Sequence, residues 1–399
     1  MSPHRFAAPT PADWSAHDGV PLLHTIATAV MRLAENTDLE AFTLPYPAEA
    51  QRALDRTVLS CLLRDADPPT SLSELLEWCR SRPLDAWPLD LPPDAFSPGD
   101  YLIDPVSLQP SQLCQEWKVR GWDSAAEQYD RAIIREALRM CRESESPESY
   151  TAFRRLLVEK PVLTTTDMFE VSTDLTLDPV RGLVELIYKP VPDGYRSHGA
   201  YVTCARCLTL LTPLADGGWW CERDRCRRQG PPVPGRELPV DEVGGLWQLE
   251  RPLRQFVTGP GRAEAELERG LKALRLPVEM WPGFDAYDLR VTFPDGWAWA
   301  IDVKDWAQPA LLGQAATAVR TEPPYNEACW VVPGHRVDAR HDYIQVYARN
   351  RTDTAQGLPL LTDRELVAAA RARLRGDTGP AFRLQHVFDG KITKGRGHA

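Results

Sequence analysis

The chain has 399 residues, a formal net charge of −10 and 43% hydrophobic residues. A chain of this length is longer than an average single domain, so we expect two or three domains. An acidic chain does not favour contact with nucleic acid along its whole surface, so any such contact must come from local basic patches. Because the sequence has no apolar run of roughly twenty residues and no signal-peptide pattern, we expect a cytoplasmic protein with no membrane contact.

The first 160 residues are predicted to be helical and have no function that we can assign. Leucines recur there at intervals of three and four residues, which is typical of amphipathic helices. Residues 111–122 fit the start of a helix-turn-helix, but also two helices that simply pack together. Proline clusters separate the segments. The predicted helices are residues 22–36, 48–65, 72–82, 109–117, 124–143 and 148–158.

Four cysteines follow a predicted connector at residues 161–200. Two residues separate Cys204 from Cys207, four separate Cys221 from Cys226, and a predicted hairpin lies between the pairs. Four thiolates in this arrangement fit tetrahedral Zn²⁺ of the structural kind, which has no open position for a substrate. We therefore predict a zinc ribbon at residues 201–236, with His198 as a substitute ligand because the second spacing is long. A redox Cys-x-x-Cys and two disulfides are the alternatives.

The predicted ribbon is basic and aromatic, unlike the acidic chain around it. Arginines beside aromatic rings can hold phosphates while bases stack, which favours a nucleic-acid contact. The alternative is a solvated surface whose tryptophans cover a small core built around the metal. The residues concerned are Arg196, Arg206, Arg223, Arg225, Arg227, Arg228, Arg236, Trp219 and Trp220.

Two carboxylates and a lysine lie on neighbouring predicted strands in the C-terminal part. Asp288 opens an apolar run that ends in a Pro-Asp-Gly turn, and the next run contains Asp302 and Lys304. The two runs should form an antiparallel hairpin that brings Asp288 beside Asp302, while strand alternation puts Asp302 and Lys304 on one face. Converging carboxylates repel each other, but they suit a hard cation such as Mg²⁺. The alternative is a surface ion pair on an edge strand.

The elements that flank this hairpin can also be predicted. A helix at residues 261–274 carries Glu264 on its buried stripe, although Glu268 competes for the same role, and a short strand follows at 277–281. After the hairpin we expect a helix at 310–319 with Gln314 near its start, then a buried strand at 327–333. Residues 343–347 are predicted as a last strand, and a capping box at Thr362 begins a further helix.

This order of elements and residues resembles the restriction-endonuclease-like, or PD-(D/E)xK, nuclease superfamily over residues 259–347. The resemblance implies that Asp288 and Asp302 bind Mg²⁺, that Lys304 orients the attacking water, and that Glu264 and Gln314 support the site. It further implies in-line attack on phosphorus by a water that Mg²⁺ or Mn²⁺ activates. Tyr287 stands where the motif has proline.

The layout of the whole chain is similar to the restriction-endonuclease proteins that accompany PIWI-RE proteins and a DNA helicase in bacterial defence. The fold class that we predict is α+β and multidomain: a helical region at 1–160, the connector, the ribbon, and a restriction-endonuclease-like α/β/α core with a mixed sheet at 250–390. The leading function is a DNA endonuclease that acts against phages or plasmids, and a homodimer would allow both strands to be cut. A noncatalytic nucleic-acid-binding adaptor and a transposon or recombination nuclease are the alternatives.

Overall fold

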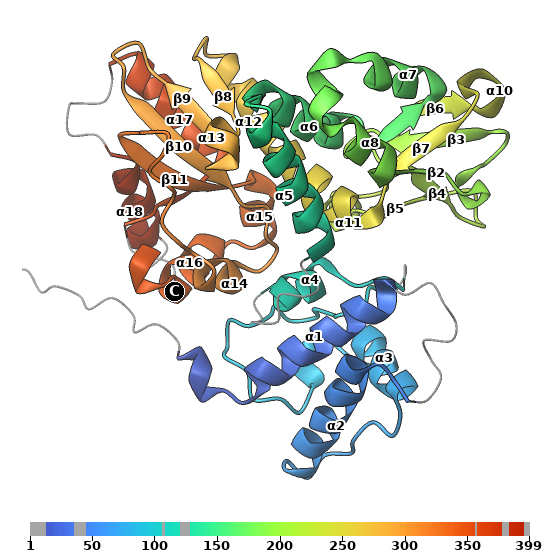
Figure 1. Cartoon of the computed structure of the whole chain (residues 1–399). Coiled ribbons are helices and arrows are strands. Elements are labelled where there is room, and N and C mark those ends of the chain that lie inside the picture. Colours follow the sequence, from blue (N-terminus) through green and yellow to red (C-terminus); the bar gives the residue numbers. More distant parts are fainter. Residues whose placement is uncertain are drawn as a thin grey trace, which may run out of the picture.

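The computed structural model describes residues 13–35, 45–105, 108–119, 128–355, 357–376 and 383–394. Figure 1 shows a group of N-terminal helices at the bottom, small sheets at the upper right and a larger sheet at the upper left. The architecture is therefore the predicted one, with a helical start, a cysteine cluster among small sheets, and a C-terminal mixed sheet with helices. No helix within the described ranges is long and apolar enough to cross a membrane.

The six helices predicted in the first part of the chain are present. The first four enclose one hydrophobic core, in which Leu23 and Trp117 are fully buried. Part of the suggested helix-turn-helix, residues 120–122, lies outside the described residues. The next two helices share their core with the C-terminal sheet instead, because Tyr150 and Trp299 belong to one cluster. The helices are α1 (Gly19–Glu35), α2 (Ala48–Leu62), α3 (Leu72–Ser81), α4 (Gln112–Val119), α5 (Gln128–Glu143) and α6 (Pro147–Glu159).

Three small sheets lie between α6 and the C-terminal sheet. One has the strand order β1-β7-β2, and the other two are the antiparallel pairs β3-β6 and β4-β5. The pair β4-β5 is the hairpin predicted between the two cysteine pairs. The strands are β1 (Val162–Thr164), β2 (Tyr188–Pro190), β3 (Ala200–Cys204), β4 (Leu211–Pro213), β5 (Trp219–Cys221), β6 (Pro234–Pro239) and β7 (Leu246–Leu249). The helices are α7 (Thr165–Thr173), α8 (Arg181–Ile187), α9 (Asp224–Arg228), α10 (Val240–Val243) and α11 (Arg251–Leu253).

The C-terminal sheet has five strands in the order β12-β11-β10-β9-β8. β9 and β10 form the predicted antiparallel hairpin, with Leu289 opposite Ile301. β11 runs parallel to both β10 and β12, so the sheet is mixed. β10 is the middle strand, so Asp302 does not lie on an edge strand, as the alternative had supposed. The strands are β8 (Val278–Met280), β9 (Leu289–Thr292), β10 (Ala298–Val303), β11 (Glu327–Val332) and β12 (Leu360–Thr362).

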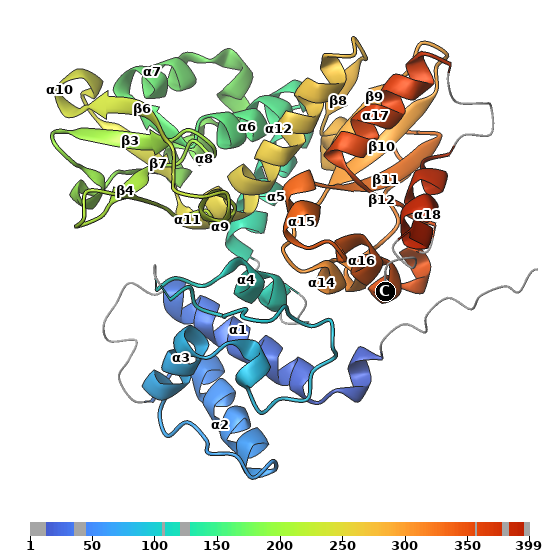
Figure 2. The same ribbon diagram turned by 180° about the vertical axis from the view of Figure 1, so that it is seen from behind.

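Helices cover both faces of this sheet. α12 and α17 lie side by side on the face seen in Figure 2, and α16 and α18 pack together on the other face, where the rings of Tyr347 and Phe388 are 6.2 Å apart. The side chain of Thr362 caps α17 as predicted. The helices are α12 (Gly259–Lys272), α13 (Pro282–Asp285), α14 (Pro309–Gln314), α15 (Gly334–Ala339), α16 (Tyr343–Asn350), α17 (Asp363–Leu374) and α18 (Leu384–Lys394).

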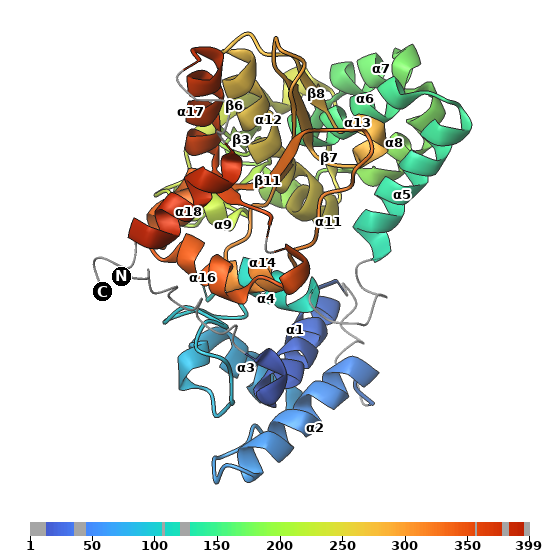
Figure 3. The same cartoon turned by 90° about the vertical axis from the view of Figure 1, so that its left-hand side faces the viewer.

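Two expectations for these elements are wrong. Residues 343–347 belong to the helix α16 rather than to a strand, and the last strand is β12. A short apolar run does not distinguish a buried helix from a buried strand, which explains the error. The helix predicted at 310–319 is the shorter α14, and Gln314 is its last residue rather than an early one. The side chains of Ala310 and Leu311 on α14 instead join the core of α1 to α4, where the two parts meet (Figure 3).

The close approach of α14 and α16 at Gly313 gives a first prediction. A Cβ at this position would lie 2.8 Å from the carbonyl oxygen of Tyr347 and 2.9 Å from the amide nitrogen of Arg351, both rigid backbone atoms. Gly313→Ala should therefore lower the free energy of unfolding by about 1–3 kcal/mol in urea denaturation. Gly182→Ala is the control, because nothing lies within 4 Å of its Cβ. Equal stability of the two variants would contradict the tight contact.

Candidate active site

The ends of β9 and β10 bring Asp288, Asp302 and Lys304 together. Asp302 Oδ1 accepts a hydrogen bond from the Asp288 amide at 3.3 Å, and Asp288 Oδ2 accepts one from the Val303 amide at 2.6 Å. Lys304 Nζ lies 3.6 Å from Asp302 Oδ2. This arrangement follows from the hairpin register and from the alternation along β10, which puts Asp302 and Lys304 on the same face.

The helix α12 adds a third acid, Glu264. Its Oε2 accepts a hydrogen bond from the indole of Trp281 at 2.7 Å, and the side chain is buried. The competing residue Glu268 is instead paired with Arg155 at 2.6 Å and with Lys272 at 2.7 Å. The structure therefore distinguishes between the two helical acids and brings Glu264 towards the strand carboxylates.

Gln314 is the predicted site residue that has a different role in the structure. Its side-chain amide donates a hydrogen bond to the Asn350 carbonyl at 2.9 Å, which ties α14 to α16. The helix α14 is short and ends at Gln314, whereas we expected this residue near the start of a longer helix.

A fourth acid, Asp285, was not predicted from the sequence. It ends a tight left-handed turn in which Trp281, Phe284 and Asp285 all have positive φ angles. Its Oδ2 accepts a hydrogen bond from the Tyr150 hydroxyl at 2.7 Å. Asp285 belongs to no predicted strand or periodic helix, so no sequence signal pointed to it.

The acids of this centre are short of positive charge. Burial, together with the nearby Glu264 carboxylate, raises the pKa of Asp288 well above its usual value. Burial also raises the pKa of Glu264, although Arg154 acts in the opposite direction. Burial alone would lower the pKa of Lys304, but the carboxylates of Asp302 and Asp288 raise it. Such mutual shifts are typical of carboxylates that a cation would stabilise.

The donor set fits a magnesium ion. Mg²⁺ takes hard oxygen ligands and uses one or two carboxylates together with water and phosphate, which Asp288 and Asp302 satisfy. Among the described residues, no three acids have ligand atoms within 4.8 Å of one another; the four cysteines alone reach that spacing. The acids therefore fit a magnesium site of few protein ligands rather than a closed protein cage.

Cys204, Cys207, Cys221 and Cys226 are buried and form a second cluster. Cys204 ends β3 and Cys221 ends β5, while Cys226 lies in the helix α9. The helical turn explains the long second spacing and makes a substitute ligand at His198 unnecessary. All four sulfurs converge, and Cys207 Sγ lies 3.5 Å from Cys221 Sγ without a disulfide. Four converging thiolates suggest a zinc site rather than a redox pair.

Most arginines of the ribbon contact the protein itself. Arg206 donates to the Cys226 carbonyl at 2.7 Å, and Arg223 donates to the Gln255 carbonyl at 2.8 Å. Two more form ion pairs with other parts of the chain: Arg225 with Glu266 of α12 at 3.0 Å, and Arg227 with Asp104 at 2.8 Å. Trp219 packs on the cysteine cluster. These contacts favour a structural role for the four arginines over the phosphate contact that we considered.

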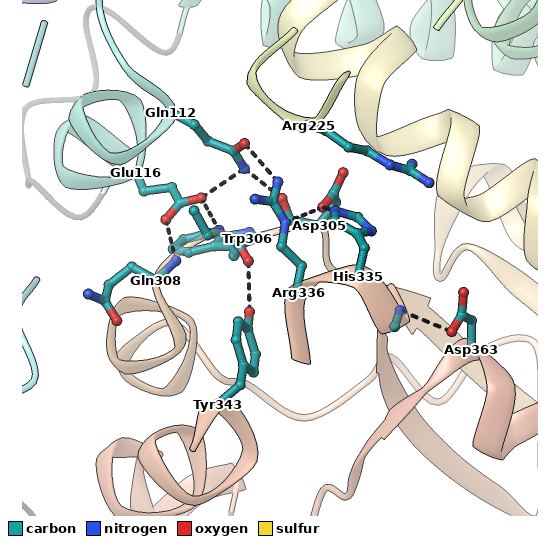
Figure 4. A network of polar contacts seen from close by, with 12 residues as sticks. Gln112, Glu116, Arg225, Asp305, Trp306, Gln308, His335, Arg336, Tyr343 and Asp363 are labelled. Carbon is teal, nitrogen blue, oxygen red and sulfur yellow. Dashed lines mark hydrogen bonds and ion pairs between the residues drawn. The ribbon is translucent and has the colours of Figure 1, made fainter. Parts of the chain in front are cut away.

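A buried polar network continues from the end of β10 into the N-terminal helices (Figure 4). Glu116 of α4 accepts hydrogen bonds from the amides of Ala307 at 2.6 Å and Gln308 at 2.9 Å. Arg336 of α15 pairs with Asp305 at 2.7 Å and donates to Gln112 of α4 at the same distance. The backbone that follows Lys304 is thus held by side chains from two other elements.

Comparison with protein families identifies two parts of the chain. Residues 261–378 match the family described as REase associating with pPIWI_RE, and residues 22–164 match pPIWI_RE three-gene island domain Y. The C-terminal part is therefore a restriction-endonuclease-like nuclease domain, as its mixed sheet and strand carboxylates indicate. More specifically, it belongs to the REase family that associates with pPIWI_RE, and the chain carries domain Y before it. Association with pPIWI_RE partners follows from both descriptions. Neither the curated proteins nor the solved structures gave a match.

Glu116 gives a prediction about pH. Burial raises its pKa to about 7 from a usual value of 4.5, against the opposing effect of the Ala307 amide and of Arg336. The pKa of Glu116 is about 7 in the folded chain and about 4.5 in the unfolded chain, so the folded state binds more protons between these values. The free energy of unfolding should therefore fall as pH rises from 4.5 to 7. Relative to Glu116→Gln, which does not titrate, the wild type should lose about 3 kcal/mol across this window. Urea denaturation at several pH values measures the difference.

The control for this experiment is Glu185→Gln, which changes an exposed glutamate on α8. Its stability should follow the wild type at every pH. If the stability of Glu116→Gln changes with pH in the same way as that of the wild type, then burial does not raise the pKa of Glu116 and our interpretation of the network is wrong.

Proposed function

We propose that the chain is an Mg²⁺-dependent endonuclease that hydrolyses DNA phosphodiester bonds in defence against phages or plasmids. The observation that carries this proposal is the convergence of Asp288, Asp302 and Lys304 at the ends of β9 and β10, two interior strands of a restriction-endonuclease-like domain. The chain would act together with a pPIWI_RE protein and a DNA helicase. A homodimer would place one such centre at each strand of a duplex.

Each residue has a role that follows from its position. Asp288 and Asp302 would hold the ion, which when bound neutralises charge on phosphate oxygens and lowers the pKa of water. Lys304 Nζ, 3.6 Å from Asp302 and 5.3 Å from the centre of the Trp330 ring, is held where it can orient the attacking water in line with phosphorus. Glu264, fixed by the Trp281 indole, supports the arrangement from the helix.

We further propose that the four cysteines bind a structural Zn²⁺. Four thiolates complete a tetrahedral coordination sphere, so no position remains for a substrate. The metal would instead fix α9 against β3 and β5. Because Arg225 and Arg227 on α9 reach Glu266 and Asp104, zinc in this position would also stabilise contacts with the nuclease domain and with domain Y.

The nuclease proposal predicts that Asp302→Ala and Lys304→Met each slow DNA cleavage by roughly 10²-fold or more, because each removes a group that acts on the reacting centre. Single-stranded, duplex and looped DNA should be incubated with Mg²⁺, Mn²⁺ or EDTA, and the products should carry 5′-phosphates. Glu279→Ala, which removes an exposed acid on β8 of the same sheet, is the matched control. Binding of DNA without cleavage under any of these conditions would favour the noncatalytic adaptor.

The zinc proposal predicts that Cys226→Ser lowers the zinc content below one ion per chain and lowers the melting temperature by several degrees, since structural zinc contributes directly to folding. Atomic absorption and thermal denaturation measure the two effects. Cys61→Ala should keep its zinc, because Cys61 is buried outside the cluster. Full zinc occupancy in Cys226→Ser would exclude the four-cysteine site.

A further inference from the structure

A buried cation from outside the nuclease domain lies in its acidic centre. Arg154 belongs to α6, within the domain Y match and far upstream of the REase match. Its guanidinium lies 3.8 Å from Glu264 Oε2 and 4.0 Å from Asp285 Oδ2, and only 10% of its side chain is exposed. Its Nε is buried without a hydrogen-bond partner in the described part of the chain. Arg154 is therefore close to the acids but not locked to either one.

The packing of α6 on α12 sets this position. A Cβ at Gly261 would lie only 2.3 Å from the Val158 side chain, so the glycine allows the two helices to approach closely. The hydroxyl of Thr258 also donates to the Leu157 carbonyl at 2.7 Å. Arg154 lies one turn before Val158 on α6, and Glu264 lies one turn after Gly261 on α12, so the close contact brings these two charges together.

The charges of the centre explain what Arg154 does there. The carboxylates of Glu264, Asp285, Asp288 and Asp302 face two fixed cations, Lys304 and Arg154. When a bound cation keeps all four carboxylates ionised, four negative charges against two positive ones leave an excess of two, which one divalent ion matches. Burial would lower the pKa of Arg154, but the negative charges of Asp285, Glu264 and Asp288 raise it.

We propose that Arg154 is a positioning residue of the nuclease centre, a built-in counter-charge that sets how tightly the acids hold their divalent cation. This inference rests on the proposed metal-dependent nuclease. Arg154 acts through the carboxylates rather than on the reacting atoms. Arg154 comes from the last helix of the domain Y match, so that region supplies part of the positive charge of the nuclease centre. Without Arg154, the four carboxylates of the REase domain would face Lys304 alone.

The test uses the full chain, loaded with zinc, and Mn²⁺ as the probe, with free Mn²⁺ followed by electron paramagnetic resonance. Arg154→Met keeps the aliphatic stem but removes the charge, so Mn²⁺ should bind about tenfold more tightly at low salt. Arg154→Lys retains a cation and should stay near the wild type. A variant that only damaged the fold would bind Mn²⁺ more weakly, so the expected direction separates the proposal from a structural ion pair.

Arg155→Met is the matched control. This neighbouring guanidinium pairs with Glu268 at 2.6 Å and with Glu159 at 3.1 Å, outside the acidic centre, so its loss should leave the affinity for Mn²⁺ unchanged. Unchanged or weaker Mn²⁺ binding by Arg154→Met would overturn the inference. If that variant does not fold, Arg154→Gln replaces it with the same expectation.

The failure of this inference can be told apart from the failure of the nuclease proposal, because no nucleic acid is present in the assay. If Asp302→Ala binds Mn²⁺ as well as the wild type does, the centre holds no metal and the proposed function fails. If Asp302→Ala binds less Mn²⁺ while Arg154→Met matches the wild type, only the role of Arg154 is wrong.

Discussion

The repulsion between closely spaced carboxylates is the constraint on which the rest of this structure depends. The β9–β10 register places Asp288 beside Asp302, and the left-handed turn and α12 add Asp285 and Glu264. Acids in a partly buried centre are stable only if cations or hydrogen-bond donors face them. The elements around the sheet provide these groups: backbone amides of the hairpin, the indole of Trp281, the lysine that follows β10, and an arginine of α6.

The helices before the ribbon contact groups of the nuclease centre. Two of their contacts with the nuclease domain lie near the end of β10. Arg154 of α6 faces the acids, whereas Glu116 of α4 holds the amides of Ala307 and Gln308, just after Lys304. A shift of α4 or α6 would therefore act directly on the backbone or on the charge of the centre, without any need for a long pathway of coupled residues.

Local sequence patterns are sufficient to predict α1 to α6, the β9–β10 hairpin and the four cysteines. Each of these depends on residues close together in the chain: helical periodicity, a turn between two apolar runs, or paired cysteine spacings. The errors and omissions have the opposite origin. Whether residues 343–347 form a strand or a helix depends on the surrounding core, and Asp285 enters the centre through a contact with Tyr150, 135 residues away.

The same reasoning applies to the ribbon arginines, whose sequence suggests a phosphate contact although their partners lie within the chain. Arg225 and Arg227 pair with Glu266 and Asp104, so their charges are already balanced by acids of two other parts. To release them for a phosphate, both of these ion pairs would have to break. Arg225 and Arg227 are thus engaged within the chain, whereas Arg196 and Arg236 are exposed on the surface of the ribbon.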